Sequence, residues 1–197
     1  ELTDEQLNMT RLAYENNADS YVLNYERRAG ALDEARIFTL DPFLKLLKEK
    51  MVSGKILFAG CGSGRDLQEV IKQGYSCVGI DISESMLNIG KILAIPAPLL
   101  KMDIERMEFP ANSFSGVFCD TAITHIKKKG IRRVLEEFRL ILEDGGVLFV
   151  SFRRGNGKLY MTDDKVGKRY YTTMTALKAR KLLASVGFQL VSTSSHK

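Results

Sequence analysis

The stretch ILFAGCGSGRD, residues 56–66, joins a short apolar run to a turn that contains three glycines, Gly60, Gly62 and Gly64. The apolar run predicts a buried strand, and the apolar residues that follow the turn recur at helical spacing. Glycine lacks a Cβ atom, so it permits a left-handed backbone and the close approach of another group. The N-terminus of a helix adds free N–H groups and a partial positive charge. The stretch therefore predicts a strand–turn–helix unit that binds a polar or anionic part of a ligand.

The same change from strand to helix repeats along the chain. A helical N-terminal segment, in which Thr3 and Gln6 match a capping box, and a helix near 41–50 precede the first strand. Later apolar runs predict strands at 76–81, 98–103, 114–120, 147–152 and 188–194, with helices between them and a polar loop after 152. This alternation predicts an α/β fold with a doubly wound, mostly parallel sheet. In such a sheet the ligand site lies at the carboxyl ends of the strands, here Ala59–Asp66, Asp81–Ile82, Asp103–Ile104 and Asp120–His125.

Composition is that of an ordinary globular protein. Of the 197 residues 45% are hydrophobic and 27% are charged, and no apolar run approaches a membrane span. The N-terminus is polar and acidic, so we expect no signal peptide in it. The three cysteines, Cys61, Cys77 and Cys119, are far apart in apolar surroundings, which is typical of reduced thiols in a cytoplasmic protein. Two histidines and the lack of a CxxC pair argue against a structural metal site.

The basic residues are dispersed along the sequence and do not form one long cluster. A net charge of +5 and a pI near 9.1 permit an anionic partner without requiring one. The basic residues form only short clusters, and no interleaved aromatic residues of an RNA-binding segment accompany them. We therefore favour solvated surface over nucleic-acid binding. The same interpretation applies to the basic residues that follow the fifth strand, namely Arg153, Arg154, Lys158 and Arg169.

A single acidic residue narrows the class of ligand. Asp81 ends the second strand, 21 positions after Gly60, which suits a carboxylate that accepts hydrogen bonds from both hydroxyls of a ribose. The glycines are spaced GxGxG rather than GxGxxG, and the chain contains no GxxxxGK phosphate loop. The residues thus favour a nucleotide-containing cofactor and disfavour one with a pyrophosphate.

Four ordered segments of the chain resemble the motifs of the class I S-adenosylmethionine-dependent methyltransferases. They are ILFAGCGSGRDL (56–67), CVGIDISESML (77–87), KMDIERMEFPANSFSGVFCDTAITHI (101–126) and VLEEFRLILEDGGVLFVSF (134–152). The resemblance covers about 55–187. It implies a single domain over 1–197, with a Rossmann-like, cofactor-binding core at 55–197 and a helical lid at 1–50. It also implies an enzyme that transfers a methyl group from S-adenosylmethionine.

The resemblance carries roles onto matching positions. The glycine turn, with Gly60, Cys61, Gly62 and Gly64, would line the methionine part of the cofactor, and Arg65 or the helix N-terminus would face its carboxylate. Asp81 would bind the ribose, Ile82 and Met86 would pack on the adenine, and Asp103 with the Ile104 backbone would meet the adenine edge. The cofactor's ammonium would meet the backbone of Asp120 or Thr121, and the lid would contribute Tyr14 and Tyr21.

Two features depart from the family pattern. The acidic residue usually found two positions before the first glycine is replaced by Phe58. The family's sheet ends in a hairpin of two strands, and this sequence offers one run, 188–194, for that region.

The chemistry of the acceptor is less well defined. The sulfonium is already an activated methyl donor, so alignment and the exclusion of water do most of the work. His125, after the fourth strand, is the candidate catalytic base, although a lone histidine is more often a packing residue. A small-molecule acceptor is the leading hypothesis. The alternatives are a tRNA or rRNA methyltransferase, a non-catalytic module that binds S-adenosylmethionine, and an oxidoreductase that uses a nicotinamide cofactor.

Overall fold

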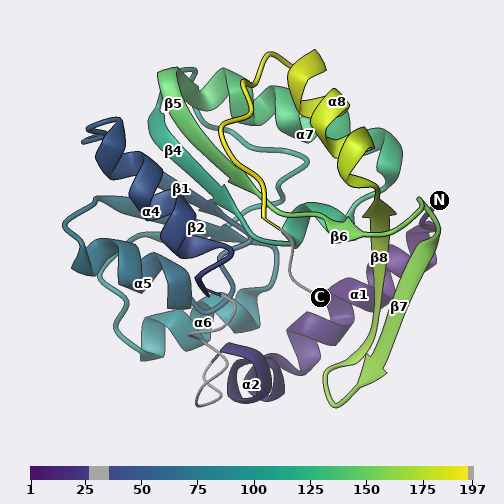
Figure 1. Ribbon diagram of the computed structural model, residues 1–197. Coiled ribbons are helices and arrows are strands. Elements are labelled where there is room, and N and C mark those ends of the chain that lie inside the picture. Colours follow the sequence, from purple (N-terminus) through teal and green to yellow (C-terminus); the bar gives the residue numbers. More distant parts are fainter. Residues whose placement is uncertain (27–35, 195–197) are drawn as a thin grey trace.

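The computed structural model describes residues 1–26 and 36–194. A parallel sheet of five strands forms its centre, in the order β3 (Leu99–Lys101), β2 (Cys77–Asp81), β1 (Ile56–Ala59), β4 (Phe114–Cys119) and β5 (Leu142–Val150) (Figure 1). The order reverses between β1 and β4, so the crevice that a doubly wound sheet offers to ligands begins where these two strands end. This architecture confirms the fold predicted from the alternating strands and helices.

Alternate residues of the strands pack into two separate hydrophobic cores, one on each face of the sheet. Leu57 and Val117 point to a core shared with α7 (Lys128–Ile141), against which α8 (Ala176–Ser185) also packs. Ile56 and Phe118 point to the opposite core, covered by α4 (Leu40–Glu49) and α5 (Arg65–Lys72). Because successive side chains of a strand lie on opposite faces, two apolar runs of four to six residues supply both layers.

The sequence signals for helix ends hold at the start of α6 (Glu84–Ile92) and at the end of α5, whereas Gly145 and Gly146, expected to stop the helix that begins near Ile131, lie within β5. Ser83 caps α6, since its hydroxyl accepts a hydrogen bond from the amide of Met86. Gly74, with a φ of +91°, lies just after α5. Among the helices of the described residues, none has the combination of length and apolar character that a membrane crossing needs.

The N-terminal segment is helical, as the capping-box pattern predicted. It forms α1 (Asp4–Asn16), α2 (Ala18–Tyr21) and a π-helical turn, η1 (Val22–Glu26). Thr3 and Gln6 exchange the two hydrogen bonds of the capping box, with lengths of 3.2 and 3.0 Å. Residues 27–35 of the expected lid lie outside the described residues.

The segment after β5 is a second, three-stranded sheet, and the prediction of a solvated loop there is wrong. Its strands are β6 (Arg153–Arg154), β8 (Gly167–Met174) and β7 (Leu159–Asp164), and β7 and β8 form an antiparallel hairpin. Arg169 is 3% exposed, because its guanidinium bonds Asp164 at 2.5 Å and lies 5.2 to 5.8 Å from three tyrosine rings of the N-terminal segment. In Figure 1 this hairpin lies against α1, so β8 packs on the N-terminal segment.

The strand predicted at 188–194 does not form. The chain after α8 runs as irregular coil (yellow in Figure 1). Leu190 and Val191 remain 47% and 60% exposed, so neither face of this segment is buried in the way that a sheet strand requires.

Candidate active site

The glycine turn between β1 and α5 lies at the point where the strand order reverses. Gly60, Gly62 and Gly64 all have positive φ, of 77°, 55° and 84°. Protein groups press on the first two: a Cβ on Gly60 would lie 2.2 Å from the Ala122 Cβ, and one on Gly62 would lie 2.4 Å from a Glu26 oxygen. The turn therefore needs glycine both for its backbone angles and for the close approach of its neighbours.

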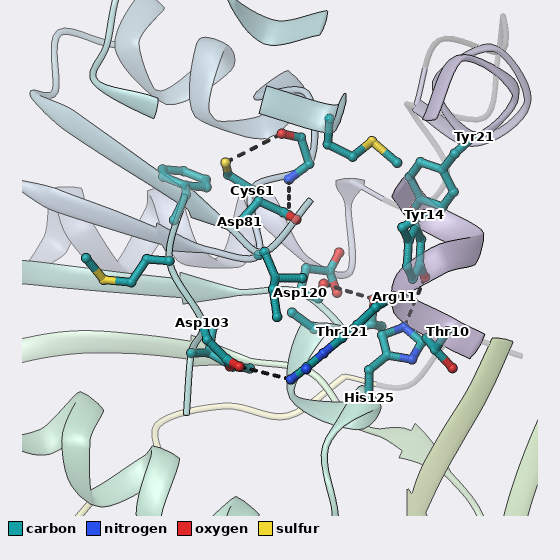
Figure 2. A pocket seen from close by; sticks show the side chains of 18 of the residues that line it. Thr10, Arg11, Tyr14, Tyr21, Cys61, Asp81, Asp103, Asp120, Thr121 and His125 are labelled. Carbon is teal, nitrogen blue, oxygen red and sulfur yellow. Dashed lines mark hydrogen bonds and ion pairs between the residues drawn. The ribbon is translucent and has the colours of Figure 1, made fainter. Parts of the chain in front are cut away.

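A cavity of about 190 Å³ lies beside this turn, at the carboxyl ends of the strands. The structure brings together around it all but one of the residues expected from the sequence: Tyr14, Tyr21, Gly60, Cys61, Gly62, Arg65, Asp81, Ile82, Met86, Asp103, Ile104, Asp120, Thr121 and His125. The exception is Gly64, which lies outside the lining because it is the N-cap of α5. Figure 2 shows that α1 and α2 supply one wall and the strand ends supply the opposite wall.

Asp81 is held rigidly at the end of β2. One of its carboxylate oxygens accepts from the amide of Gly62 and the other from the amide of Ser83, each at 2.9 Å. Burial raises the pKa of the Asp81 carboxyl, and these hydrogen bonds oppose that rise. The carboxylate therefore links the glycine turn to the start of α6 while it lines the cavity.

Asp103, at the end of the third strand, already has two partners. Its side chain accepts from Arg11 at 3.0 Å and from the amide of Glu105 at 2.9 Å. Arg11 extends from α1 across the cavity to make this ion pair (Figure 2). An adenine amino group at Asp103 would share the carboxylate with Arg11, since a carboxylate has about four acceptor positions.

His125 and Tyr14 form a hydrogen-bonded pair on the wall opposite the glycine turn. The Nδ1 atom of His125 lies 2.8 Å from the carbonyl oxygen of Tyr170, which can only accept, so Nδ1 carries the proton. The Nε2 atom is then a free lone pair, and the Tyr14 hydroxyl, 3.0 Å away, donates to it. Burial, together with the nearby Arg169 and Arg153 and opposed by the Tyr170 carbonyl, lowers the pKa of His125 to about 4, so the ring is neutral at pH 7.

Asp120 and Thr121 end β4 in a strained turn. Thr121 has a φ of +61°, and its carbonyl accepts from both the amide and the hydroxyl of Thr124 at 2.9 and 2.6 Å. Asp120 accepts from the Ser151 hydroxyl at 2.6 Å, and its own carbonyl accepts from the Thr121 hydroxyl at 2.9 Å. Burial raises the pKa of the Asp120 carboxyl.

Arg65 opens α5 and is paired within the chain. Its guanidinium donates two hydrogen bonds to Asp66, at 2.8 and 2.7 Å, and a longer one to the carbonyl of Tyr25. Because Asp66 already offsets its charge, Arg65 has little unopposed positive charge for a ligand carboxylate.

The N-terminal segment is bonded to the start of α6 as well as to Asp103. Glu15 accepts from the hydroxyls of Ser83 and Ser85, at 2.7 and 3.0 Å, and so lies at the positive end of that helix. Met86 packs with Ala18 and Val22 beneath this contact. The cavity wall made by α1 and α2 is therefore a fixed part of the site in this structure.

Glu26 is one of several lining residues that sequence reasoning missed, with Leu7, Thr10, Arg11 and Ala122 among the others. It ends η1, is 7% exposed, and its carboxylate bonds the amide and the hydroxyl of Ser63 in the glycine turn. The sequence holds no signal for this contact, because 37 residues separate the partners and no helical or strand periodicity relates them.

The fold and the site together indicate a class of cofactor-binding domain. A parallel sheet ordered β3-β2-β1-β4-β5, a glycine turn at the point of reversal and acidic residues ending the next strands are typical of a doubly wound domain that binds a nucleotide-containing cofactor. Residues 56–146 match the family described as "Methyltransferase domain". This match over residues 56–146 confirms the resemblance of the chain to the class I S-adenosylmethionine-dependent methyltransferases.

Individual relatives agree with this assignment. The chain is 28% identical over 124 residues to a ubiquinone biosynthesis O-methyltransferase of Coxiella burnetii. The aligned part covers 60% of this chain and 52% of that protein. The chain thus spans about half the length of this curated relative. It is similar in fold to DhpI, solved with S-adenosylhomocysteine, at a TM-score of 0.72 and 16% identity over 94% of this chain and 89% of that one. It is also similar to the 1,6-didemethyltoxoflavin-N1-methyltransferase of Burkholderia thailandensis, at a TM-score of 0.69 and 18% identity over 98% and 83% of the two chains.

Proposed function

We propose that this chain is an enzyme that transfers a methyl group from S-adenosylmethionine to a small-molecule acceptor. The observation that carries the proposal is the single cavity shared by the glycine turn, Asp81, Asp103 and the wall formed by α1 and α2. An adenosine and a methionine moiety need both ribose-binding and adenine-binding acceptors beside a turn free of side chains, and these groups meet here.

The cofactor would lie along the strand ends. Asp81 accepts from the ribose hydroxyls, Ile82 and Met86 pack on the adenine, and Asp103 accepts from the adenine amino group. The methionine moiety then follows the turn from Gly60 to Gly62, because that part of the lining has no side chain in the way. Bound there, the cofactor supplies a sulfonium, which is a methyl donor that needs no further activation.

The acceptor would bind between the turn and the N-terminal segment. Leu7, Thr10, Tyr14, His125 and Ile126 line that part of the cavity, so it offers apolar surface with a few polar atoms. The wall formed by α1 favours a small acceptor over a base within a folded RNA. Two of the similar proteins are named for small-molecule methylation, which supports the same reading.

His125 is the proposed proton acceptor. Its Nε2 lone pair accepts a hydrogen bond from the Tyr14 hydroxyl, and Tyr14 lines the cavity. The carbonyl of Tyr170 holds the ring in the tautomer that carries its proton on Nδ1. When the acceptor oxygen or nitrogen takes the methyl group, its proton passes to Tyr14 and the Tyr14 proton passes to Nε2. A weakly basic imidazole is sufficient, because the methylated acceptor is strongly acidic before it loses that proton.

A cytoplasmic location is part of the proposal. Cys61, Cys77 and Cys119 are all free in the structure, and burial raises the pKa of each thiol, which supports unreactive thiols in a reducing compartment.

Calorimetric titration with S-adenosylmethionine, S-adenosylhomocysteine and NAD tests the cofactor assignment. We expect micromolar binding of the first two and none of NAD. Turnover is then sought by release of S-adenosylhomocysteine over a panel of small hydroxyl and amine acceptors, with bulk tRNA as the competing arm. Failure of both sulfur nucleosides to bind would refute the proposal. Methylation of tRNA alone, with an affinity that falls steeply with salt, would replace the acceptor.

A further inference from the structure

Glu26 places a buried carboxylate directly against the glycine turn. It is 7% exposed and lines the cavity beside Gly60 and Gly62. One oxygen accepts from the Ser63 amide at 3.4 Å, and the other accepts from the Ser63 hydroxyl in a short hydrogen bond. The first of these oxygens lies 2.4 Å from the position that a Gly62 Cβ would take. The carboxylate thus occupies the space that a side chain on the turn would fill.

The charge of this carboxylate has no cation paired with it among the described residues. The guanidinium of Arg65, whose charge acts to lower the pKa of Glu26, donates two hydrogen bonds to Asp66 instead. Burial raises the pKa of Glu26, and the hydrogen bonds from Ser63 only partly oppose this. A buried carboxylate without a counter-ion is costly, so a cation that enters the cavity at this point is stabilised.

The backbone groups that might otherwise receive a cation are partly used. The Thr121 carbonyl accepts two hydrogen bonds from Thr124, which fills both of its lone pairs. The Asp120 carbonyl accepts one from the Thr121 hydroxyl, and the Asp120 carboxylate accepts one from Ser151. Glu26 and Asp120 therefore both keep free acceptor positions, and Glu26 is the carboxylate that lies directly against Gly62 in the turn.

The presence of Phe58 also supports a role for Glu26 at the turn. It stands where the family usually has an acidic residue, and its ring lies 5.1 Å from that of Phe118 in the apolar core. The strand itself therefore contributes no carboxylate to the turn. Glu26 brings one to the turn from a distant part of the chain.

We infer that Glu26 binds the α-ammonium group of the cofactor's methionine moiety. This inference rests on the proposed function, since it needs the methionine moiety to lie along the glycine turn. Glu26 replaces the backbone of Asp120 or Thr121 as the ammonium acceptor. A cation held by Glu26 would add to the contact that this residue already makes with Ser63 between η1 and the glycine turn.

The test uses ligands that differ at the ammonium group. Wild-type protein and Glu26→Gln are titrated calorimetrically with S-adenosylhomocysteine, its desamino analogue and 5′-methylthioadenosine, which lacks the amino-acid moiety. Glutamine keeps an acceptor for Ser63 and removes the charge. Loss of a charge-assisted hydrogen bond should weaken S-adenosylhomocysteine binding about tenfold to a hundredfold, with methylthioadenosine unchanged. The desamino analogue should bind the wild type as weakly as S-adenosylhomocysteine binds the variant, with no further loss in the variant.

The control is Asp19→Asn, which removes a carboxylate from the exposed side of the same segment; it should bind all three ligands like the wild type. Equal S-adenosylhomocysteine affinity in wild type and Glu26→Gln would overturn the inference. Tighter binding by the variant would overturn it too, and would mean that Glu26 competes with the cofactor's carboxylate. An equal loss for methylthioadenosine would also overturn it, since the effect would then be on the turn as a whole. If the wild type binds no sulfur nucleoside at all, the proposed function itself fails.

Discussion

The buried His125 should make the stability of the fold depend on pH in a way that one substitution removes. The folded protein holds this histidine neutral with a pKa of about 4, while the unfolded chain has the ordinary value of 6.5. Between these values the unfolded state binds a proton that the folded state does not, so the free energy of unfolding falls as pH falls. Below pH 4 both states are protonated and the loss is complete. The groups that face the ring are Tyr14 from α1, Tyr171 and Arg169 from β8, and Arg153 from β6.

The magnitude follows from the two pKa values. Between pH 7 and pH 5 the linkage amounts to about 2 kcal/mol of lost stability, out of about 3 kcal/mol for the full shift. The assay is urea unfolding of wild type and His125→Gln at pH 7, 6 and 5. The buried carboxyl groups titrate in both proteins, so their effect cancels in the difference. The difference in unfolding free energy should shrink by about 2 kcal/mol from pH 7 to pH 5. A difference that stays constant to within a few tenths of a kcal/mol would show that His125 is not held neutral by its site.

Three further substitutions test other parts of the structure. Asp81→Asn should weaken S-adenosylhomocysteine and 5′-methylthioadenosine about equally, by about tenfold to a hundredfold in calorimetry, because both ligands carry the ribose; an effect on the first alone would refute the ribose assignment. Gly60→Ala should cost about 2 kcal/mol or more in urea unfolding, since its Cβ would meet a methyl carbon at 2.2 Å, whereas Gly145→Ala, at a similar φ of +79° with nothing within 4 Å, should cost about 1 kcal/mol. Equal costs would mean that the backbone angle alone matters at Gly60. Phe138→Ala, at 0% exposure on α7, should cost about 3–5 kcal/mol, against less than about 1 kcal/mol for Leu140→Ala at 54% on the same helix; similar costs would contradict the assigned inner face.

The central sheet was predictable because its signals are local. The run at 56–59 is apolar throughout and the run at 114–119 is apolar except for Ser115, which suits strands that are covered on both faces. The caps at Thr3 and Ser83 and the turn after Gly74 likewise depend on residues a few positions apart. The same locality explains why the strand-end residues were found: each follows directly from where its strand stops.

The predictions failed where the deciding contacts are distant. The segment from Leu159 to Met174 is rich in polar and basic residues, and its strands form because they pack on α1. Arg169 reads as a surface residue until Asp164 and the tyrosine rings of the N-terminal segment surround it. The run at 188–194 has the residues of a strand, but only Phe188 packs against a core, while Leu190 and Val191 remain exposed.

By itself the sequence determined the strands and helices of the central sheet, the glycine turn, and the acidic residues that end the strands, since these depend on residue type and short spacing. Only the tertiary structure decided what lies against those groups. It brought Glu26 to Ser63 across 37 residues, Arg11 to Asp103 across 92, and Tyr14 to His125 across 111. The physical reason is that burial, pKa and charge pairing belong to the neighbours a residue meets in space, and the chain's local pattern does not specify those neighbours.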